Sequence, residues 1–295
     1  MKKFIVVTGG SGFVGSNLIR YLINKSAYHI ISLDDYSSGN KKNHIKNSRV
    51  RYIKGNTKDI DNIFKKSVNK INSIFHFGEF SRIYQSFSQM NKCIQSNSIG
   101  TNAVFDFCLK NKIKLIYSAT SASLGNKGKD KNLSPYAFTK AKNLELLENL
   151  KRWFNFKYEV IFFYNVYGPG QIKKGKMSTV IGIFEDCYLR NIPLPVVRPG
   201  TQSRRFTHIT DTVKICYKAW KNNSSRFYSI SNRKSYTILE VARMFGKKIK
   251  FLPSRKGERF ASALTSLSLS NRIHRSYGEI DLKNYINDFI KISNK

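Results

Sequence analysis

The chain has 295 residues, of which 41% are hydrophobic, so it can form one large domain or two unequal ones, and wholesale disorder is excluded. Lysine and arginine number 52 against 18 acidic residues, and the formal net charge of +34 would suit a nucleic acid, an anionic membrane surface or an acidic small molecule. Because the lysines are scattered rather than gathered in a tail or stripe, we expect no specific nucleic-acid binding.

The first half of the chain alternates short apolar runs with amphipathic segments. The run FIVVT at 4–8 predicts a buried strand, and the segment 12–25 places apolar residues on one face of a helix. Further strands are predicted at 28–35, 50–56, 73–79, 114–120 and 158–168. Helices are predicted at 59–68 and at 134–153, and a longer helix is predicted to end at 111. This alternation predicts an α/β fold with a Rossmann-type, doubly wound parallel sheet that helices cover on both faces.

The pattern changes after Gly168, where proline and glycine become more frequent. Short mixed elements follow at 204–211 and 226–231, and a helix is predicted at 237–245. We therefore expect an NAD-binding domain at 1–168 and a smaller C-terminal substrate-binding α/β lobe at 169–295. Interleaving of the two along the chain would make this boundary approximate.

The first strand runs directly into TGGSGFVG, where Gly9, Gly12 and Gly15 form a GxxGxxG pattern. Glycines there allow a tight turn and let a pyrophosphate approach the backbone N–H groups at a helix N-terminus. Asp34 ends the second predicted strand about 20 residues later, where a carboxylate accepts hydrogen bonds from ribose hydroxyls and repels a 2′-phosphate. The pattern predicts NAD rather than NADP; the alternative is a glycine turn that merely caps a helix.

A second candidate site lies in SPYAFTKAK. Ser134 suits a helix N-cap and Pro135 the first helical position, so Tyr136 falls in the first turn and Lys140 one turn later on the same face. The positive helix end and the ammonium both favour a phenolate that acts as a base. The same spacing is common on solvated helix faces. Upstream, Thr120 in YSATSAS is a candidate hydroxyl for a substrate oxygen.

Together these residues resemble the extended short-chain dehydrogenase/reductase superfamily, and within it the NAD-dependent nucleotide-sugar epimerase/dehydratase family, whose best-known member is UDP-glucose 4-epimerase. The stretches VTGGSGFVGSNL, LDDYSSG, NSIGT, SPYAFTKAK, YNVYGPGQ and RRFTHITD follow the family's order over nearly the whole chain. The resemblance implies that Tyr136 is the general base, that Lys140 holds the nicotinamide ribose, and that Thr120 is the catalytic hydroxyl.

The resemblance also implies two sets of binding residues. For NAD they are Tyr136 and Lys140 with Gly9, Gly12, Phe13, Val14, Gly15, Asp34, Asn56, Thr57 and Asn97. For a nucleotide-diphosphate sugar they are Glu79, Asn165, Arg204, Arg255, Glu258 and Ser262, with the arginines on the diphosphate and Glu258 on the nucleotide ribose.

The chain departs from the family in four places. No acid follows Thr120, although dehydratases need one to expel water, so epimerisation is favoured. Glu79 replaces a small residue, and its carboxylate would meet the nicotinamide, a substrate hydroxyl or solvent. The segment 124–134 is shorter than usual, which would open the rim of the pocket. Asn56 replaces an aspartate that contacts adenine, a role that an amide can also fill.

These observations favour a UDP-sugar 4-epimerase that works through a transient 4-keto intermediate and serves surface-polysaccharide synthesis. Ser262 falls where a bulky aromatic excludes N-acetylated sugars, so UDP-N-acetylglucosamine joins UDP-glucose as an expected substrate. The alternatives are a 4,6-dehydratase, a 4-keto reductase and a non-enzymatic NAD-binding regulator. The family also implies a homodimer formed through the helix that carries Tyr136 and the helix before it.

The cysteines and the apolar runs bear on location. Four cysteines lack CxxC or Cys/His spacing, so we expect free thiols in a reducing compartment and no metal site. The apolar run after the N-terminal lysines is too short for a signal peptide, and no stretch approaches the ~20 apolar residues of a membrane span. We therefore expect a cytoplasmic protein.

Overall fold

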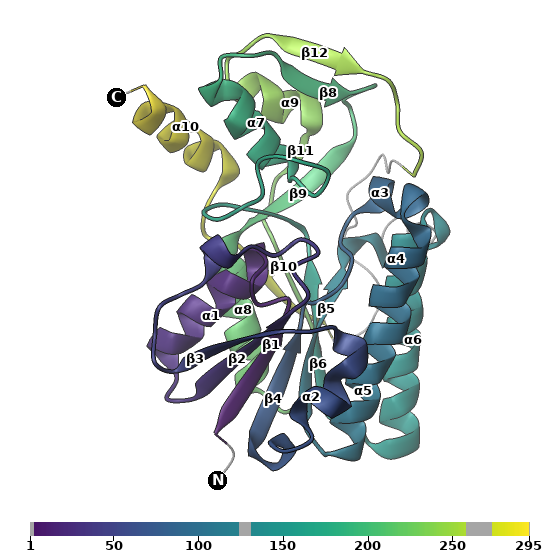
Figure 1. The fold of residues 1–295 in the computed structure, drawn as a ribbon. Helices are drawn as coiled ribbons and strands as arrows, with labels where there is room; N and C mark the ends of the chain where they lie inside the picture. The colour runs from purple at the N-terminus through teal and green to yellow at the C-terminus, as the bar shows by residue number, and fades with distance from the viewer. Residues whose placement is uncertain (1–2, 124–130, 258–272, 295) are drawn as a thin grey trace.

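An eight-stranded parallel sheet forms the larger lobe of the protein (Figure 1). The computed structural model describes residues 3–123, 131–257 and 273–294. All neighbouring strands of the sheet are parallel. In spatial order they are β13 (Ile273–Tyr277), β10 (Phe227–Ser231), β6 (Tyr158–Phe163), β5 (Lys114–Thr120), β4 (Ile71–His76), β1 (Phe4–Thr8), β2 (His29–Asp34) and β3 (Val50–Lys54).

Helices cover both faces of this sheet, as the apolar strands predict. Along β1, Ile5 and Val7 point into one apolar core and Val6 into the other, because successive side chains of a strand alternate. The first core packs under α1 (Phe13–Lys25) and α8 (Ile209–Lys221). The second packs under α2 (Ile60–Phe64), α5 (Thr101–Lys110) and α6 (Pro135–Phe154).

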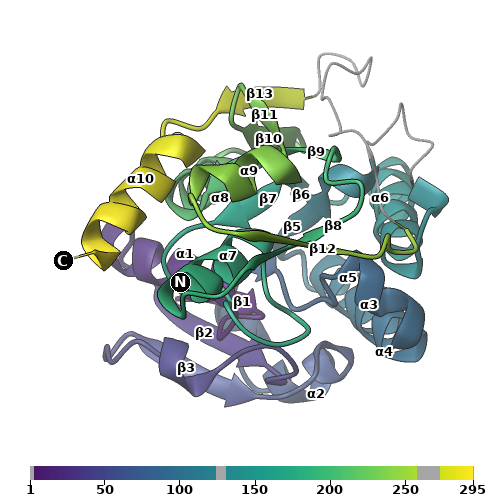
Figure 2. The ribbon, with the colours of Figure 1, turned by 90° about the horizontal axis from the view of Figure 1, so that it is seen from above.

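The smaller lobe has its own core, built around Tyr167, Phe184, Phe206 and Phe245. Its sheets are β11 (Ser235–Thr237), β9 (Ser203–His208) and β7 (Asn165–Tyr167), and the pair β12 (Ile249–Leu252) and β8 (Leu194–Val197). Its helices are α7 (Val180–Leu189), α9 (Ile238–Met244) and α10 (Leu282–Ser293). Figures 1 and 2 show this lobe over the edge of the main sheet where the strands end.

Short elements connect the strands of the larger lobe. They are η1 (Lys41–Asn43), η2 (Thr57–Asp59), η3 (Val68–Lys70), α3 (Ile83–Ser88), α4 (Met90–Ile94) and η4 (Gln95–Gly100). No helix formed by the described residues is long and apolar enough to cross a membrane. Among the same residues, no group of histidine, cysteine, aspartate or glutamate side chains could hold a metal ion. All four cysteines are buried free thiols.

The predicted fold class is confirmed, and two details differ from expectation. The helix predicted at 59–68 shrinks to α2, which short 3-10 turns flank on either side. The strand predicted at 158–168 splits into β6 in the main sheet and β7 in the small one. The boundary at 168 does not separate the lobes in space, because β10 and β13 return to the main sheet. The expected interleaving is therefore present.

Candidate active site

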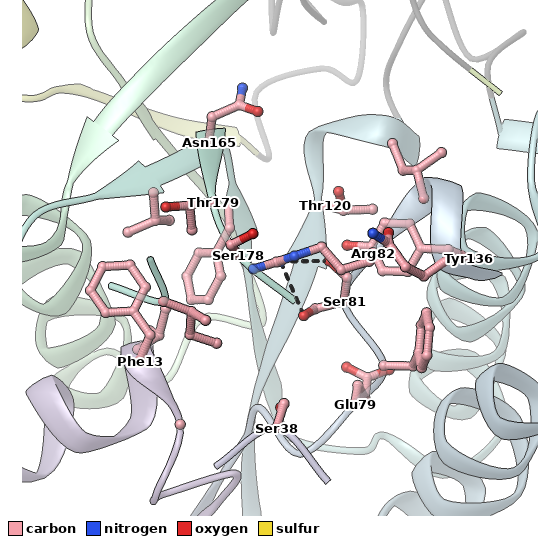
Figure 3. Close-up of a pocket in the computed structure, with 18 of the residues that line it drawn as sticks. Phe13, Ser38, Glu79, Ser81, Arg82, Thr120, Tyr136, Asn165, Ser178 and Thr179 are labelled. Atoms are coloured by element: carbon pink, nitrogen blue, oxygen red, sulfur yellow. Dashed lines mark hydrogen bonds between the residues drawn. The ribbon is translucent and has the colours of Figure 1, made fainter. Parts of the chain in front are cut away.

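A cleft of ≈ 540 Å³ lies between the two lobes, where the parallel strands of the main sheet end. Residues at or just after the ends of four strands line it: Gly9, Asp34, Phe77 and Thr120. The smaller lobe supplies the opposite wall, which includes Ser178 and Thr179 (Figure 3). Ligands of doubly wound folds bind at this edge of the sheet, so the topology alone makes the cleft the candidate site.

The glycine turn forms one end of this cleft. Gly9 has a φ of +68°, and a Cβ there would lie 2.8 Å from the carbonyl carbon and oxygen of Phe77. A Cβ on Gly15 would lie 2.2 Å from the carbonyl oxygen of Gly9. Gly12 is the N-cap of α1 and has no side chain that could accept the first N–H groups of the helix. The turn therefore fits a pyrophosphate, which needs exposed N–H groups and close backbone approach.

The rest of the predicted cofactor set extends from this turn. Phe13 and Val14 line the cleft at the start of α1. The Asp34 carboxylate accepts hydrogen bonds from the N–H groups of Ser11 and Tyr36, both at 2.8 Å. Burial raises the pKa of Asp34, and these two N–H groups oppose the shift. The carboxylate is therefore fixed in position at the end of β2, where the sequence predicts a ribose contact.

Asn56 and Thr57 line the cleft next to the end of β2, whereas Asn97 is not among the residues that line it. The Asn56 side chain caps η2 by accepting the N–H of Lys58 at 3.0 Å. Asn97 is fully buried, and its amide bonds both the N–H and the carbonyl of Phe80, at 2.7 and 3.0 Å. Asn97 thus holds the loop after β4 in place, and its expected contact with the cofactor stays a prediction.

The hydroxyls of Thr120 and Tyr136 lie on one wall of the cleft (Figure 3). Thr120 ends β5, and Tyr136 lies in the first turn of α6. The predicted start of this helix is confirmed: the Ser134 hydroxyl accepts the N–H of Ala137 at 3.1 Å, and Pro135 is the first helical residue. The local sequence therefore directs Tyr136 into the cleft.

Lys140 lies one turn further along α6, and its side chain is only 5% exposed. Its ammonium forms an ion pair with Glu79 and donates to the carbonyl oxygen of Ser118. It also lies 4.7 Å from the centre of the Tyr117 ring. The Glu79 side chain is 2% exposed, so it does not face solvent, and it pairs with the lysine that the sequence predicts to be catalytic.

Three of the residues predicted to bind the sugar nucleotide line the opposite side of the cleft, namely Asn165, Arg204 and Arg255. Asn165 begins β7 and donates to the carbonyl oxygen of Arg205 at 2.8 Å. Arg204 lies on β9 and is 8% exposed, whereas Arg255 follows β12 and is exposed. The Arg255 guanidinium lies 5.2 Å from the centre of the Tyr84 ring, a residue of the larger lobe. Glu258 and Ser262 lie outside the described residues.

Sequence reasoning missed two parts of the site. Arg82, in the loop after β4, crosses the cleft and donates through Nε to the carbonyl oxygen of Met177 at 3.1 Å. Ser178 and Thr179 stand at the N-terminus of α7, where the Thr179 hydroxyl accepts the N–H of Gly182 at 3.0 Å. The pair Ser178–Thr179 before an apolar run carries an N-cap signature for α7, but no local pattern marks Arg82.

Residues 5–231 match the sequence model of the NAD dependent epimerase/dehydratase family. The chain belongs to this family. Its cofactor is therefore NAD, and the protein is an enzyme of the extended short-chain dehydrogenase/reductase type. The cleft agrees with this assignment, because Gly9, Gly15 and Asp34 line it at the edge of the sheet where doubly wound folds bind their ligands.

Relatives within the family catalyse different reactions. An ADP-L-glycero-D-manno-heptose-6-epimerase from Brachyspira hyodysenteriae is 27% identical over 81% of this chain and 79% of that protein. A UDP-N-acetyl-alpha-D-glucosaminuronate decarboxylase from Bacillus cytotoxicus is 26% identical over 82% of this chain and 79% of that protein. A UDP-glucose 4-epimerase structure from Thermotoga maritima matches with a TM-score of 0.86 at 23% identity, over 99% of this chain and 100% of that one, which confirms the fold.

Proposed function

We propose that the protein is a nucleotide-sugar 4-epimerase that acts on UDP-glucose or UDP-N-acetylglucosamine through a transient 4-keto sugar. One observation carries the proposal: the cleft brings Thr120, Tyr136 and Lys140 to one wall beside the dinucleotide cradle. This set provides a hydroxyl to orient the sugar oxygen, a base to take its proton and a cation to hold the cofactor ribose. The relatives support the reaction class but not the sugar.

In this mechanism Tyr136 removes the proton from the sugar 4-hydroxyl, and Thr120 hydrogen-bonds the same oxygen. NAD, held by the glycine turn and Lys140, would supply a hydride acceptor for C4, and would supply the hydride again after the keto sugar turns over in the cleft. Tyr136 gives the proton back to the 4-oxygen, so the product is an isomer and no net oxidation remains. The residues of the chain thus hold the sugar, move one proton and keep the reaction away from water.

The carboxylates of the cleft favour epimerisation over dehydration. Three described residues bring a carboxylate to the lining: Asp34, Asp35 and Glu79. Asp34 ends β2 and Asp35 follows it, at the proposed ribose end of the cleft, and Glu79 is buried against Lys140. Ser121 and Ala122 follow Thr120, as noted from the sequence, and neither is an acid. The described part of the cleft therefore presents no free acid beside Tyr136 to help expel water.

The opposite wall suits a nucleotide diphosphate. Arg204 and Arg255 supply guanidinium groups for phosphate oxygens, and the N-terminus of α7, which begins at Val180, lines the same side of the cleft. Asn165 is proposed to contact the sugar. The roles of Glu258 and Ser262 remain predictions. The net charge of +34 favours capture of such an anion, most strongly at low salt.

The first test is to incubate the purified protein with NAD and a panel of nucleotide sugars, and to analyse the products by mass and by sugar-proton NMR. A new stereoisomer of unchanged mass with no net NADH would support the proposal. Loss of one water, or a two-hydrogen change matched by the cofactor, would replace it with a dehydratase or a reductase.

A matched pair of variants tests the base. Tyr136→Phe removes the reacting hydroxyl and should lower turnover at least about 100-fold. Tyr217→Phe removes a hydroxyl that donates to the carbonyl oxygen of Lys25 on the far side of the sheet, and should keep turnover. Full turnover by Tyr136→Phe would exclude the proposed mechanism.

We further propose a homodimer formed through α4 and α6. An apolar patch covers the outer side of these helices and the turn before α6. Its residues are Met90, Ile94, Leu133 and Phe138, which are 54%, 39%, 44% and 48% exposed. Contiguous exposed apolar side chains of this kind favour association with a partner surface. The position agrees with the pairing that the family resemblance implies.

A further inference from the structure

Glu79 is the carboxylate nearest to the catalytic pair among the described residues. It lies three residues after the end of β4 and lines the cleft together with Ser118, Tyr136 and Lys140. Figure 3 shows Glu79 and Tyr136 on the same wall of the cleft. A carboxylate with a 2% exposed side chain is costly to bury unless charged and hydrogen-bonding partners surround it.

Four donors surround this carboxylate. Lys140 forms the ion pair, and the hydroxyls of Thr101 and Tyr117 each donate at 3.1 Å. The amide of Asn143 donates at 3.4 Å. Burial raises the pKa of Glu79, and Lys140 opposes that shift more than the other donors do. The ammonium of Lys140 and the amide nitrogen of Asn143 can only donate, and both hydroxyls can donate, so this shell suits the ionised form of Glu79, which only accepts.

The hydrogen bonds behind Glu79 support this protonation state. Burial lowers the pKa of His76 to about 3, so its ring is neutral. Thr101 donates to Glu79, and therefore the Nε2 of His76 is assigned as the donor to Thr101, at 2.9 Å. Its Nδ1 then accepts from Thr8 at 2.8 Å, and Thr8 in turn accepts the N–H groups of Phe77 and Gly78. Every donor in this chain has an acceptor.

The buried pair changes the charge at the cofactor site. Alone, the ammonium of Lys140 would add a positive charge beside the nicotinamide ribose. With Glu79 ionised, the two charges cancel to a good approximation, and the effect is larger than it would be in water because both side chains are buried. The oxidised nicotinamide ring is a cation and the reduced ring is neutral, so the two cofactor forms respond differently to this charge.

We propose that Glu79 is a positioning residue that fixes the ammonium of Lys140 and places a negative charge at the nicotinamide end of the cleft, so that the site favours NAD over NADH. The inference rests on the proposed roles of Tyr136 and Lys140. An epimerase must return to the oxidised cofactor in every cycle, and this bias would limit release of the keto sugar with NADH left behind.

The test compares dissociation constants for NAD and for NADH, measured by NADH fluorescence and by competition. In Glu79→Gln and Glu79→Ala, the dissociation constant for NAD divided by the dissociation constant for NADH should rise about tenfold, which means that NAD binding weakens relative to NADH binding. Tyr117→Phe removes one donor to Glu79 and keeps both charges, so its ratio should stay within about threefold of the wild-type value.

Several outcomes would overturn the inference. A ratio unchanged in folded Glu79 variants, or equal weakening of NAD and NADH, would reduce Glu79 to a structural role. Wild-type protein that binds NADH more tightly than NAD would contradict the proposal even if neither variant folds. Cofactor binding requires no sugar, so a shifted ratio without epimerisation in the sugar panel would keep this inference and remove the proposed reaction.

Discussion

Replacing Gly15 with alanine would place a methyl group 2.2 Å from the carbonyl oxygen of Gly9 and 2.8 Å from the Cα of Gly10. Ordinary contact with a Cβ begins near 3.4 Å, so the start of α1 and the glycine turn must separate by about 1.2 Å. Both contacting groups are backbone, and no side-chain rotation relieves the overlap. We therefore expect the pyrophosphate cradle itself to change shape.

The structure sets the size of the effect. Overpacking costs about 1–3 kcal/mol, and the higher helix propensity of alanine returns about 1 kcal/mol, so the loss of stability should be modest. The loss of NAD affinity should be larger. A movement of about 1.2 Å takes an N–H group out of hydrogen-bonding range of a phosphate oxygen, and one charge-assisted bond accounts for roughly 10- to 100-fold in affinity.

The assay pairs an NAD titration with a thermal melt. The control is Gly246→Ala, which lies after α9, has a φ of +64° and would meet nothing within 4 Å. Its left-handed backbone costs about 1–2 kcal/mol with a side chain present, so its melting temperature should fall while its NAD affinity stays unchanged. If the folded Gly15→Ala variant bound NAD with wild-type affinity, the proposal that the glycine turn binds the pyrophosphate would be refuted.

Three other predictions concern specificity, pH and assembly. Asp34→Ala should improve NADP binding relative to NAD at least about tenfold, because it removes the charge that repels a 2′-phosphate; an unchanged ratio would move the ribose elsewhere. Burial lowers the pKa of His208 from 6.5 to about 4. As the pH falls, this imidazole is therefore protonated at a higher pH in the unfolded chain than in the folded protein. Stability should therefore drop by up to about 3 kcal/mol between those values, and His208→Asn should flatten this loss in pH-dependent melts; an identical slope would contradict it. Phe138→Asp should turn a dimer into a 34.0 kDa monomer by light scattering, and a monomeric wild-type protein would dismiss the proposed interface.

The parts of the site that the sequence predicts share one property, which is that neighbours in the chain determine them. Gly9 and Gly15 are needed by the turn they form, and Asp34 follows from the length of one strand–helix–strand unit. Ser134 and Pro135 set the start of α6, and this places Tyr136 in the first turn. Short-range sterics and the helical period decide such features, and both can be recognised from a few consecutive residues.

The lobe boundary is a feature that neighbouring residues in the chain do not determine. The chain leaves the main sheet after β6, builds part of the smaller lobe, returns to the main sheet with β10, adds β11, α9 and β12 to the smaller lobe, and returns again with β13. No local pattern at 227–231 indicates which sheet the strand joins, because an apolar strand fits either one. The pairing of β10 with β6 is decided by which surfaces remain to be covered once the two lobes have packed.

The sequence by itself therefore determined the family, the cofactor and the residues proposed for the chemistry, because each rests on a contiguous motif. Only the tertiary structure placed Arg82 across the cleft against Met177, and only it paired Glu79 with Lys140 across 61 positions of sequence. Parallel strands joined by crossover helices bring their ends together at one edge of the sheet, so side chains from distant segments meet there. The ion pair between Glu79 and Lys140 sets the charge of the proposed catalytic site, and the spacing of residues along the chain does not predict that ion pair.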